Sequence, residues 1–292
     1  MLAELTPELL ALTALAGLAA GLLDSIVGGG GLILTPAMLN LHPGLSILQL
    51  IGTQRTSSML GTSVAAWNYL SRIPVERKVV VPACIGALVA SAIGVQFAKR
   101  LDPELLKWTV LAICAVLAVY TAFRKDFGLV EARRYPLEKE ALVATGVGAA
   151  CGFYNGLIGP GTGTIMVFAF VSVLGLDFLK SSGVSKAANV AADVSSWTVL
   201  AIGGFVVWVL AVPLILGNML GSWIGSHLAI RKGQRFVRYV FLAVVTALIG
   251  KLAFDLLRVR MGGWTEFFSV LFPEHKRQHR RRPLYVPTGD AR

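Results

Sequence analysis

Long apolar stretches separated by short polar loops recur along the whole chain. They cover residues 8–41, 46–70, 79–98, 104–123, 141–174, 180–202, 205–230 and 236–257. Most reach the length of about 20 residues that a helix needs to cross the roughly 30 Å hydrocarbon core of a bilayer. A soluble helix of this length would carry a charged face. The pattern therefore predicts an all-α, polytopic protein of the cell (inner) membrane.

Two of these stretches, 8–41 and 141–174, are too long for a single crossing, and both contain glycine clusters. As one helix, residues 8–41 would extend about 51 Å at about 1.5 Å per residue. Each glycine costs about 1 kcal/mol relative to alanine inside a helix. Irregular backbone at membrane depth persists only where it is buried in protein or lines a polar cavity. We therefore expect both stretches to break at their glycines, and each break is a candidate binding site.

The two broken stretches belong to an internal repeat. Shifting the chain by 131 residues places Asp24 on Asn155 and aligns DSIVGGG with NGLIGPG. The same spacing relates Gly28 to Gly159, Gly30 to Gly161, Gly52 to Gly183, Arg55 to Lys186, Ser58 to Asn189, Pro82 to Pro213, Gly86 to Gly217, Ser91 to Ser222 and Gly94 to Gly225. It predicts two homologous halves, each with one broken segment and three ordinary spans. The expected organisation is a first repeat at 8–123, a basic connecting loop at 124–140, a second repeat at 141–257 and a basic, poorly ordered tail at 258–292.

The number of crossings depends on whether each break is a kink or a re-entrant hairpin. Hairpins give each half an odd number of crossings and hence inverted repeats, a common transporter plan. The basic loops 71–78 and 124–140 are expected on the cytoplasmic side. Hairpins also place the basic loop 231–238 there but leave the basic tail outside, and plain crossings do the reverse. Inverted repeats are the favoured interpretation.

The backbone that follows each break is suited to an anion. New half-helices are expected to begin at about Leu32 and Thr162, with free N–H groups and a positive dipole end near the membrane centre. Glycine lets the backbone approach a ligand closely. The candidate substrate-binding residues in the breaks are Gly28, Gly29, Gly30, Gly31, Gly159, Gly161, Thr162 and Gly163. The alternative is that these small residues only allow close helix packing.

Two cations, Arg55 and Lys186, occupy equivalent positions of the two halves and are further candidates for the anion site. A cation deep in lipid must face a partner or a cavity. Asn155 and Asn189 are expected to join them in binding the substrate. The alternatives are an ion pair between Arg55 and Asp24, and a Lys186 side chain that extends to the lipid headgroups.

Asp24 and Asp193 are candidates for carrying a coupling proton. Asp24 stands beside the first glycine cluster and has no acidic counterpart, because its equivalent is Asn155. Asp193 follows Lys186 by two helical turns and so shares its helix face. The two acids predict either a proton relay or a purely structural polar network.

Composition limits the class of protein and its partners. The chain of 292 residues is 55% hydrophobic and 15% charged, with a formal net charge of +11 and a mean hydropathy of +0.69. In so apolar a chain we expect the positive charge to serve membrane orientation and binding of anionic lipid, not of nucleic acid. The motifs GxSxG, HExxH and the P-loop lysine are absent, and GGGG lacks the preceding strand of a dinucleotide fingerprint. No enzymatic activity, cofactor or metal site is predicted.

Four segments together resemble the TauE/SafE family of sulfite and organosulfonate exporters. They are DSIVGGGG, GFYNGLIGPGTGT, SKAANVAADVSS and SHLAIRKGQRFVR. The resemblance spans about residues 8–257 and is most specific to members described as membrane transporters of unassigned substrate. It implies an all-helical membrane fold, transport of small anions that contain oxidised sulfur, and basic residues at the positions of Arg55 and Lys186.

Together these observations predict a secondary transporter of a small anion that works by alternating access at a midplane site between the repeats. The expected partners are the anionic substrate and the lipid bilayer, and a homodimer is left open. Two other interpretations also stay open. One is a non-transporting scaffold or helper subunit whose glycines only pack helices, and the other is a passive anion channel.

Overall fold

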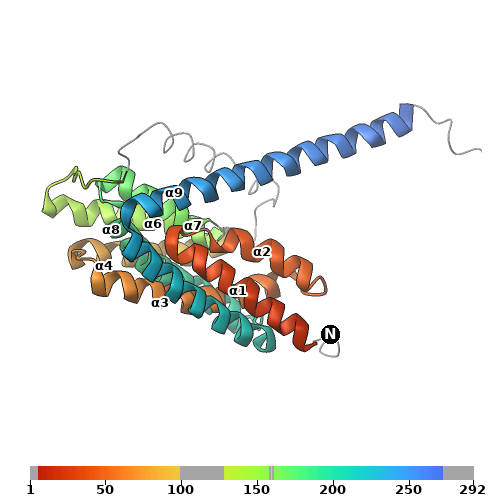
Figure 1. Ribbon diagram of the computed structural model, residues 1–292, viewed down its shortest axis with the longest axis horizontal. Helices are drawn as coiled ribbons and strands as arrows, with labels where there is room; N and C mark the ends of the chain where they lie inside the picture. Colours follow the sequence, from red (N-terminus) through yellow and green to blue (C-terminus); the bar gives the residue numbers. More distant parts are fainter. Residues whose placement is uncertain (1–5, 99–127, 158, 160, 272–292) are drawn as a thin grey trace, which may run out of the picture. The chain divides into compact units, whose positions relative to one another are not determined.

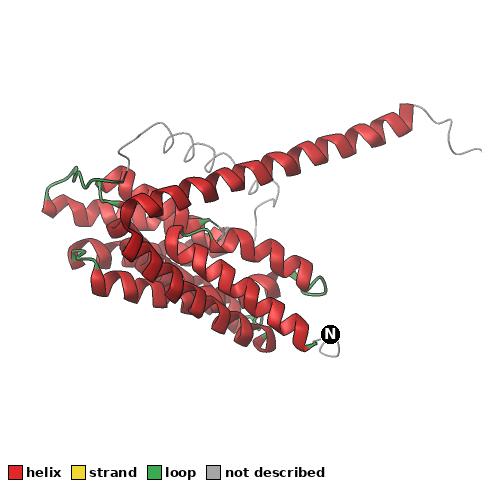
Figure 2. Ribbon diagram, viewed as in Figure 1, coloured by secondary structure: helices red, strands yellow, loops and turns green. Residues whose placement is uncertain are grey.

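The computed structural model of the protein describes residues 6–98, 128–157, 159 and 161–271, and every regular element in this part of the chain is a helix (Figures 1 and 2). The helices are α1 (Pro7–Val27), α2 (Gly30–Leu41), α3 (Ile47–Arg72), α4 (Arg77–Ala98), α6 (Leu137–Leu157), α7 (Thr162–Ala169), the π-helix η2 (Phe170–Leu174), α8 (Phe178–Ile202) and α9 (Trp208–Leu271). The all-helical prediction is confirmed. The expected span 104–123 and the start of the loop 124–140 lie outside the described residues.

Both predicted breaks are present, and each contains a glycine with a positive φ. Gly28, with a φ of 90°, ends α1 by donating its N–H to the carbonyl of Asp24 at 2.7 Å, and α2 starts at Gly30. Gly159 has a φ of 88° between α6 and α7. Residues with a side chain rarely adopt such φ values, so these two turns favour glycine.

Helix boundaries recur at the spacing found in the sequence. The helices α3 and α4 and, 131 residues further along, α8 and α9 begin at equivalent positions. The residues before α3 and α8, Ser46 and Asp177, each cap their helix with a side-chain oxygen, as N-cap residues commonly do. The inverted orientation of the two halves in the membrane stays a prediction.

The helix α9 occupies the region in which a loop was predicted at 231–238. The helix is interrupted only at Gly233, which has a φ of 78° and a ψ of −173°. A connection between two helical segments is therefore present in the predicted region, but it is shorter than expected, because the segments meet at one glycine that tolerates this conformation, without a longer polar linker. The second compact unit begins at residue 250, and its described residues, 250–271, are helical past position 258, where the tail was expected to start. Residues 272–292 lie outside the described part.

Small residues bring α4 and α6 close together. A Cβ added to Gly148, Gly152 or Gly156 of α6 would lie within 2.4 Å of a backbone oxygen of α4. The equivalent residues Gly17 and Gly21 of α1 meet the backbone of α9 in the same way. Such close backbone approaches are typical of helix contacts inside membranes. The two halves thus share the same kind of helix contact, in which glycines let the backbones approach closely.

The distribution of side chains is that of a multi-pass membrane protein. Large apolar side chains such as Leu15 and Ile85 are exposed, whereas Lys186 and Asn155 are buried. Polar groups turned inward and apolar groups turned outward are expected in lipid. Three described segments are long and apolar enough by themselves to cross a membrane, namely Pro7–Val27, Arg77–Phe97 and Trp208–Ala243.

Candidate functional site

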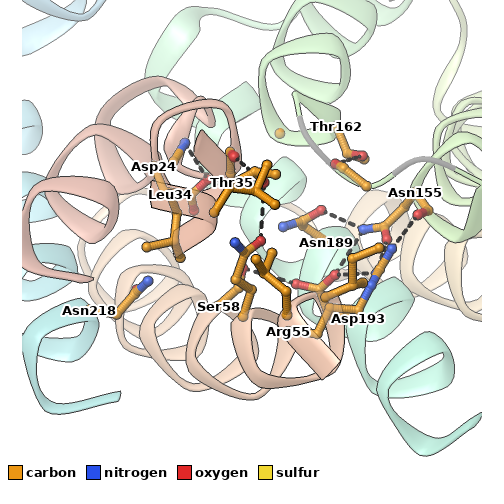
Figure 3. A pocket seen from close by; sticks show the side chains of 18 residues that line it. Asp24, Leu34, Thr35, Arg55, Ser58, Asn155, Thr162, Asn189, Asp193 and Asn218 are labelled. Atoms are coloured by element: carbon orange, nitrogen blue, oxygen red, sulfur yellow. Dashed lines mark hydrogen bonds and ion pairs between the residues drawn. The ribbon is translucent and has the colours of Figure 1, made fainter. Parts of the chain in front are cut away.

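A cavity of about 370 Å³ lies between the two glycine breaks (Figure 3). Its volume is in the range of small-molecule sites. The predicted site residues that line it are Asp24, Gly30, Gly31, Arg55, Asn155, Gly159, Thr162, Gly163, Asn189 and Asp193. Gly28, Gly29, Gly161 and Lys186, which were also predicted, are not among the lining residues.

Further residues that were not predicted as site residues also line the cavity. The polar ones are Thr35, Gln54, Ser58 and Asn218, and the apolar ones are Leu34, Leu39, Leu50 and Ile51. Gln54 is directly beside Arg55 in an apolar stretch, which was a usable signal. Its Nε2 atom is buried and has no hydrogen-bond partner among the described residues. The apolar residues carried no signal, because such residues dominate every span.

The two glycine breaks touch each other at Gly28 and Gly163. A Cβ at Gly28 would lie 2.2 Å from the carbonyl carbon of Gly163, and a Cβ at Gly163 would lie 2.6 Å from the Cα atom of Gly28. No side chain fits between these two backbones, so the contact requires glycine. The close-packing interpretation therefore applies to this pair. Gly30, Gly31 and Gly159 border the cavity, and so does Gly163.

Two helix N-termini also border the cavity. Gly30 is the first residue of α2, and Thr162 is the first residue of α7. The N–H of Gly30 donates to Oδ1 of Asp24 at 3.4 Å, and the hydroxyl of Thr162 donates to the carbonyl of Gly159 at 2.6 Å. Helix N-termini contribute N–H groups and positive partial charge, which favour an anion nearby.

Lys186 forms a buried ion pair with Asp24. Its Nζ atom lies 3.0 Å from Oδ2 of Asp24 and also donates to the backbone carbonyl of Asp24. Oδ2 accepts a further hydrogen bond from the hydroxyl of Thr62 at 3.1 Å. The Lys186 side chain has 0% exposure. Its predicted extension to the headgroups is therefore wrong, because the other half of the protein supplies a carboxylate in the interior.

Arg55 forms the second buried ion pair, with Asp193. Its Nη1 atom lies 3.2 Å from Oδ1 of Asp193 and also donates to the side chains of Asn155 and Ser196. Its Nη2 atom donates to the backbone carbonyl of Asn155 at 2.7 Å. Asp193 accepts further hydrogen bonds from Asn155 at 3.0 Å and from Ser58 at 3.3 Å. The alternative pairing of Arg55 with Asp24 is therefore wrong.

The contacts of the two cations are equivalent under the repeat. Lys186 binds both the side chain and the backbone carbonyl of Asp24. Arg55 binds both the side chain and the backbone carbonyl of Asn155, the residue equivalent to Asp24. Each half thus supplies the cation that binds the end of the other half's first helix. The two networks differ in the position of their acid. Lys186 pairs with Asp24 of α1, whereas Arg55 pairs with Asp193 of α8.

A further cluster of ion pairs, outside the cavity, joins segments predicted to be cytoplasmic. Arg133 pairs with Glu76, with Glu131 at 2.8 Å and with Glu140 at 3.1 Å, and Lys180 pairs with Glu131 at 2.6 Å. Burial would raise the pKa of Glu76, but the hydrogen bond from Arg133, a backbone hydrogen bond and the positive charges of Arg133 and Lys180 together outweigh it and lower the pKa. Burial would also raise the pKa of Glu131, but the hydrogen bonds and positive charges of Lys180 and Arg133 together lower it. Hydrogen bonds to Glu131 and Glu76 raise the pKa of Arg133.

Apolar helices that are broken around a cavity with buried charges define the class of membrane transporters. The chain belongs to the family described as sulfite exporter TauE/SafE, whose family model matches residues 13–252. The resemblance found in the sequence is confirmed, as are the membrane location and the transporter class.

Curated relatives are similar over most of their length. A "probable membrane transporter protein" of Sinorhizobium sp is 29% identical over 86% of this chain and 95% of its own. One from Haemophilus influenzae is 28% identical over 89% of this chain and 98% of its own. The "probable membrane transporter protein YfcA" of Escherichia coli is 27% identical over 86% of this chain and 91% of its own. No solved structure matches the chain.

Proposed function

We propose that the protein is a secondary transporter of a small anion that contains oxidised sulfur, either a sulfur oxyanion or an organosulfonate. The observation that carries this proposal is the position of Arg55, a buried cation that lines the cavity between two helix N-termini. Guanidinium groups and helix N-termini both favour oxyanions. The description of the family supports sulfite and related anions as the substrates to test first.

Alternating access around the cavity is the proposed mechanism. The cavity is lined by residues of both halves, and the two breaks meet at the contact of Gly28 with Gly163. A site at the interface of two repeats becomes accessible from either side when one repeat rocks against the other. The proposed substrate contacts are Arg55, Asn155 and the N-termini of α2 and α7. Lys186 lies behind them and positions Asp24.

Two measurements test this function. Purified protein is screened for thermal stabilisation by sulfite, sulfate, thiosulfate, sulfoacetate, taurine and carboxylates, and uptake of the stabilising anion is then measured in proteoliposomes. We expect saturable uptake that Arg55→Ala abolishes, while Arg77→Ala, at an exposed position of α4, leaves it intact. Stabilisation by no anion beyond general salt effects would indicate a scaffold. Conductance far above carrier rates would indicate a channel.

A further inference from the structure

The two buried ion pairs differ in whether a substrate could reach their cation. The side chain of Lys186 has 0% exposure, and it is not among the residues that line the cavity. Arg55 and Asp193 have side-chain exposures of 10% and 6%, and both line the cavity. An anion in the cavity could therefore compete with Asp193 for Arg55, but it could not compete with Asp24 for Lys186.

The charges around the cavity cancel before any substrate enters. The ionisable residues that line it are Asp24, Arg55 and Asp193. Together with Lys186 they make two pairs of opposite charge. An incoming monoanion would leave one negative charge uncompensated in a poorly solvated site, which is energetically costly. Uptake of one proton would restore neutrality.

We propose that the anion and a proton bind together, with Asp193 as the proton acceptor; this inference rests on the proposed function. The anionic group of the substrate takes the place of the Asp193 carboxylate on the guanidinium of Arg55, and the released carboxylate binds one proton. The loaded site is then neutral, and the protein is a symporter of one proton with one monoanion. The pair of Lys186 with Asp24 stays intact throughout.

The contacts of Arg55 and Asp193 fit this exchange. When Asp193 is released, the Asn155 carbonyl and the Ser196 hydroxyl still hold the guanidinium in the cavity. The protonated carboxyl keeps the hydroxyl of Ser58 within hydrogen-bond distance. A carboxylate that loses its cation in a buried site is favoured in its neutral form.

The charged surroundings of Asp193 favour the same site for the proton. Arg55 of α3 and Asp24 of α1 face Asp193, and Lys186 lies two turns earlier on α8. The helices α4 and α6 place no ionisable side chain in the described lining of the cavity. Once the substrate occupies Arg55, the negative charges of the substrate and of Asp24 both disfavour an ionised Asp193.

Counting protons during binding tests the proposal. The probe is 1-propanesulfonate, because a sulfonate stays ionised and any proton taken up must bind to the protein. Calorimetric titration of the purified protein in buffers of different ionisation enthalpy gives the number of protons bound per sulfonate. We expect one proton in the wild type and none in Asp193→Asn, while Glu138→Gln, at an exposed position in the first turn of α6, is the control and should keep one proton. In the pH range in which Asp193 is ionised in the empty protein, the Kd of the wild type for the sulfonate should rise about tenfold per pH unit, because one proton binds with each anion.

The outcomes separate this inference from the proposed function. If the wild type bound neither the sulfonate nor sulfite, both the proposed anion transport and the symport inference would be contradicted. Sulfonate binding by the wild type without proton uptake would overturn the symport inference and leave the anion site standing. Proton uptake that persists in Asp193→Asn would assign the proton to another acid and overturn this inference. Should Asp193→Asn fail to fold, infrared difference spectra of the wild type decide, since a protonated carboxyl band must appear when the sulfonate binds.

Discussion

The guanidinium of Arg55 lies directly against Gly159. A Cβ at Gly159 would be 2.8 Å from Nη2 of Arg55, a separation at which the guanidinium would have to move. The Asn155 carbonyl holds the same nitrogen at 2.7 Å. The second glycine break therefore shapes the space that the cation occupies, and a substitution there acts on the proposed site through Arg55.

Gly159→Ala is expected to weaken anion binding about tenfold, which corresponds to 1.4 kcal/mol. The added methyl group displaces Arg55, and the φ of 88° adds strain of about 1 kcal/mol for any residue other than glycine. Gly204→Ala is the matched control, because Gly204 has a φ of 73° but nothing within 4 Å of an added Cβ. Thermal shift measures the stability loss, which both variants should show. Equal anion affinity in the two variants would contradict a role for Gly159 in placing Arg55.

Lys186→Met is expected to destabilise the protein by about 3–5 kcal/mol, the usual cost of leaving a buried charge without its partner. Asp24 would keep Thr62 and Gly30 as hydrogen-bond donors but would lose its cation. The double variant Lys186→Met with Asp24→Asn should recover part of this loss, because no charge is then left unpaired. Denaturant unfolding in detergent measures both. A double variant less stable than the single one would show that the pair contributes more than charge compensation.

These two sites also show what the sequence alone could predict. The breaks at Gly28 and Gly159 were predictable, since a glycine cluster is costly inside a long membrane helix. The cross-pairing of the cations was not, because Lys186 and Asp24 are 162 residues apart in the chain and their contact depends on how the halves cross. The repeat contained the necessary clue, since it relates Arg55 to Lys186 and Asp24 to Asn155.

Other features had little or no local signal. The apolar lining of the cavity by Leu50 and Ile51 looks in the sequence like any lipid-facing stretch. The basic residues around Gly233 indicated a connection between spans, but not that the two helical segments would meet at this one glycine without a longer loop. In both cases the outcome depends on tertiary contacts and backbone geometry, which hydropathy does not encode.

The ion-pair cluster around Arg133 is expected to make stability depend on pH in the acid range. The pKa values of Glu76 and Glu131 are lowered from 4.5, so their contribution is fully present above about pH 4.5 and is lost as the pH falls through the lowered values. Melting temperatures recorded against pH should therefore fall more steeply for the wild type than for Glu76→Gln. Glu138→Gln, at an exposed position in the first turn of α6, is the control and should follow the wild type.

The apolar part of the cavity is expected to bind the carbon chain of an organosulfonate. Each buried CH₂ group contributes about 0.8 kcal/mol, so affinity should rise about fourfold for each carbon from methanesulfonate to propanesulfonate. Ile51→Ala, which removes part of this lining, should reduce the increase and leave sulfite affinity unchanged. Ile85→Ala, at an outward position with 58% exposure, is the control. An increase per carbon that is the same in Ile51→Ala and the wild type would place the carbon chain elsewhere.

Gly163→Ala is expected to separate the two breaks and to abolish anion binding together with part of the stability. The new Cβ would meet the Cα atom of Gly28 at 2.6 Å, and a backbone atom cannot turn aside as a side chain can. Inserted methyl groups in packed interiors typically cost about 1–3 kcal/mol. Gly146→Ala in α6 is the matched control, because nothing lies within 4 Å of its added Cβ and alanine favours the helix there. Thermal shift with and without propanesulfonate measures both effects. If Gly163→Ala lost stability but kept the sulfonate-induced shift, the meeting of the two breaks would serve the fold alone and the anion would bind independently of it.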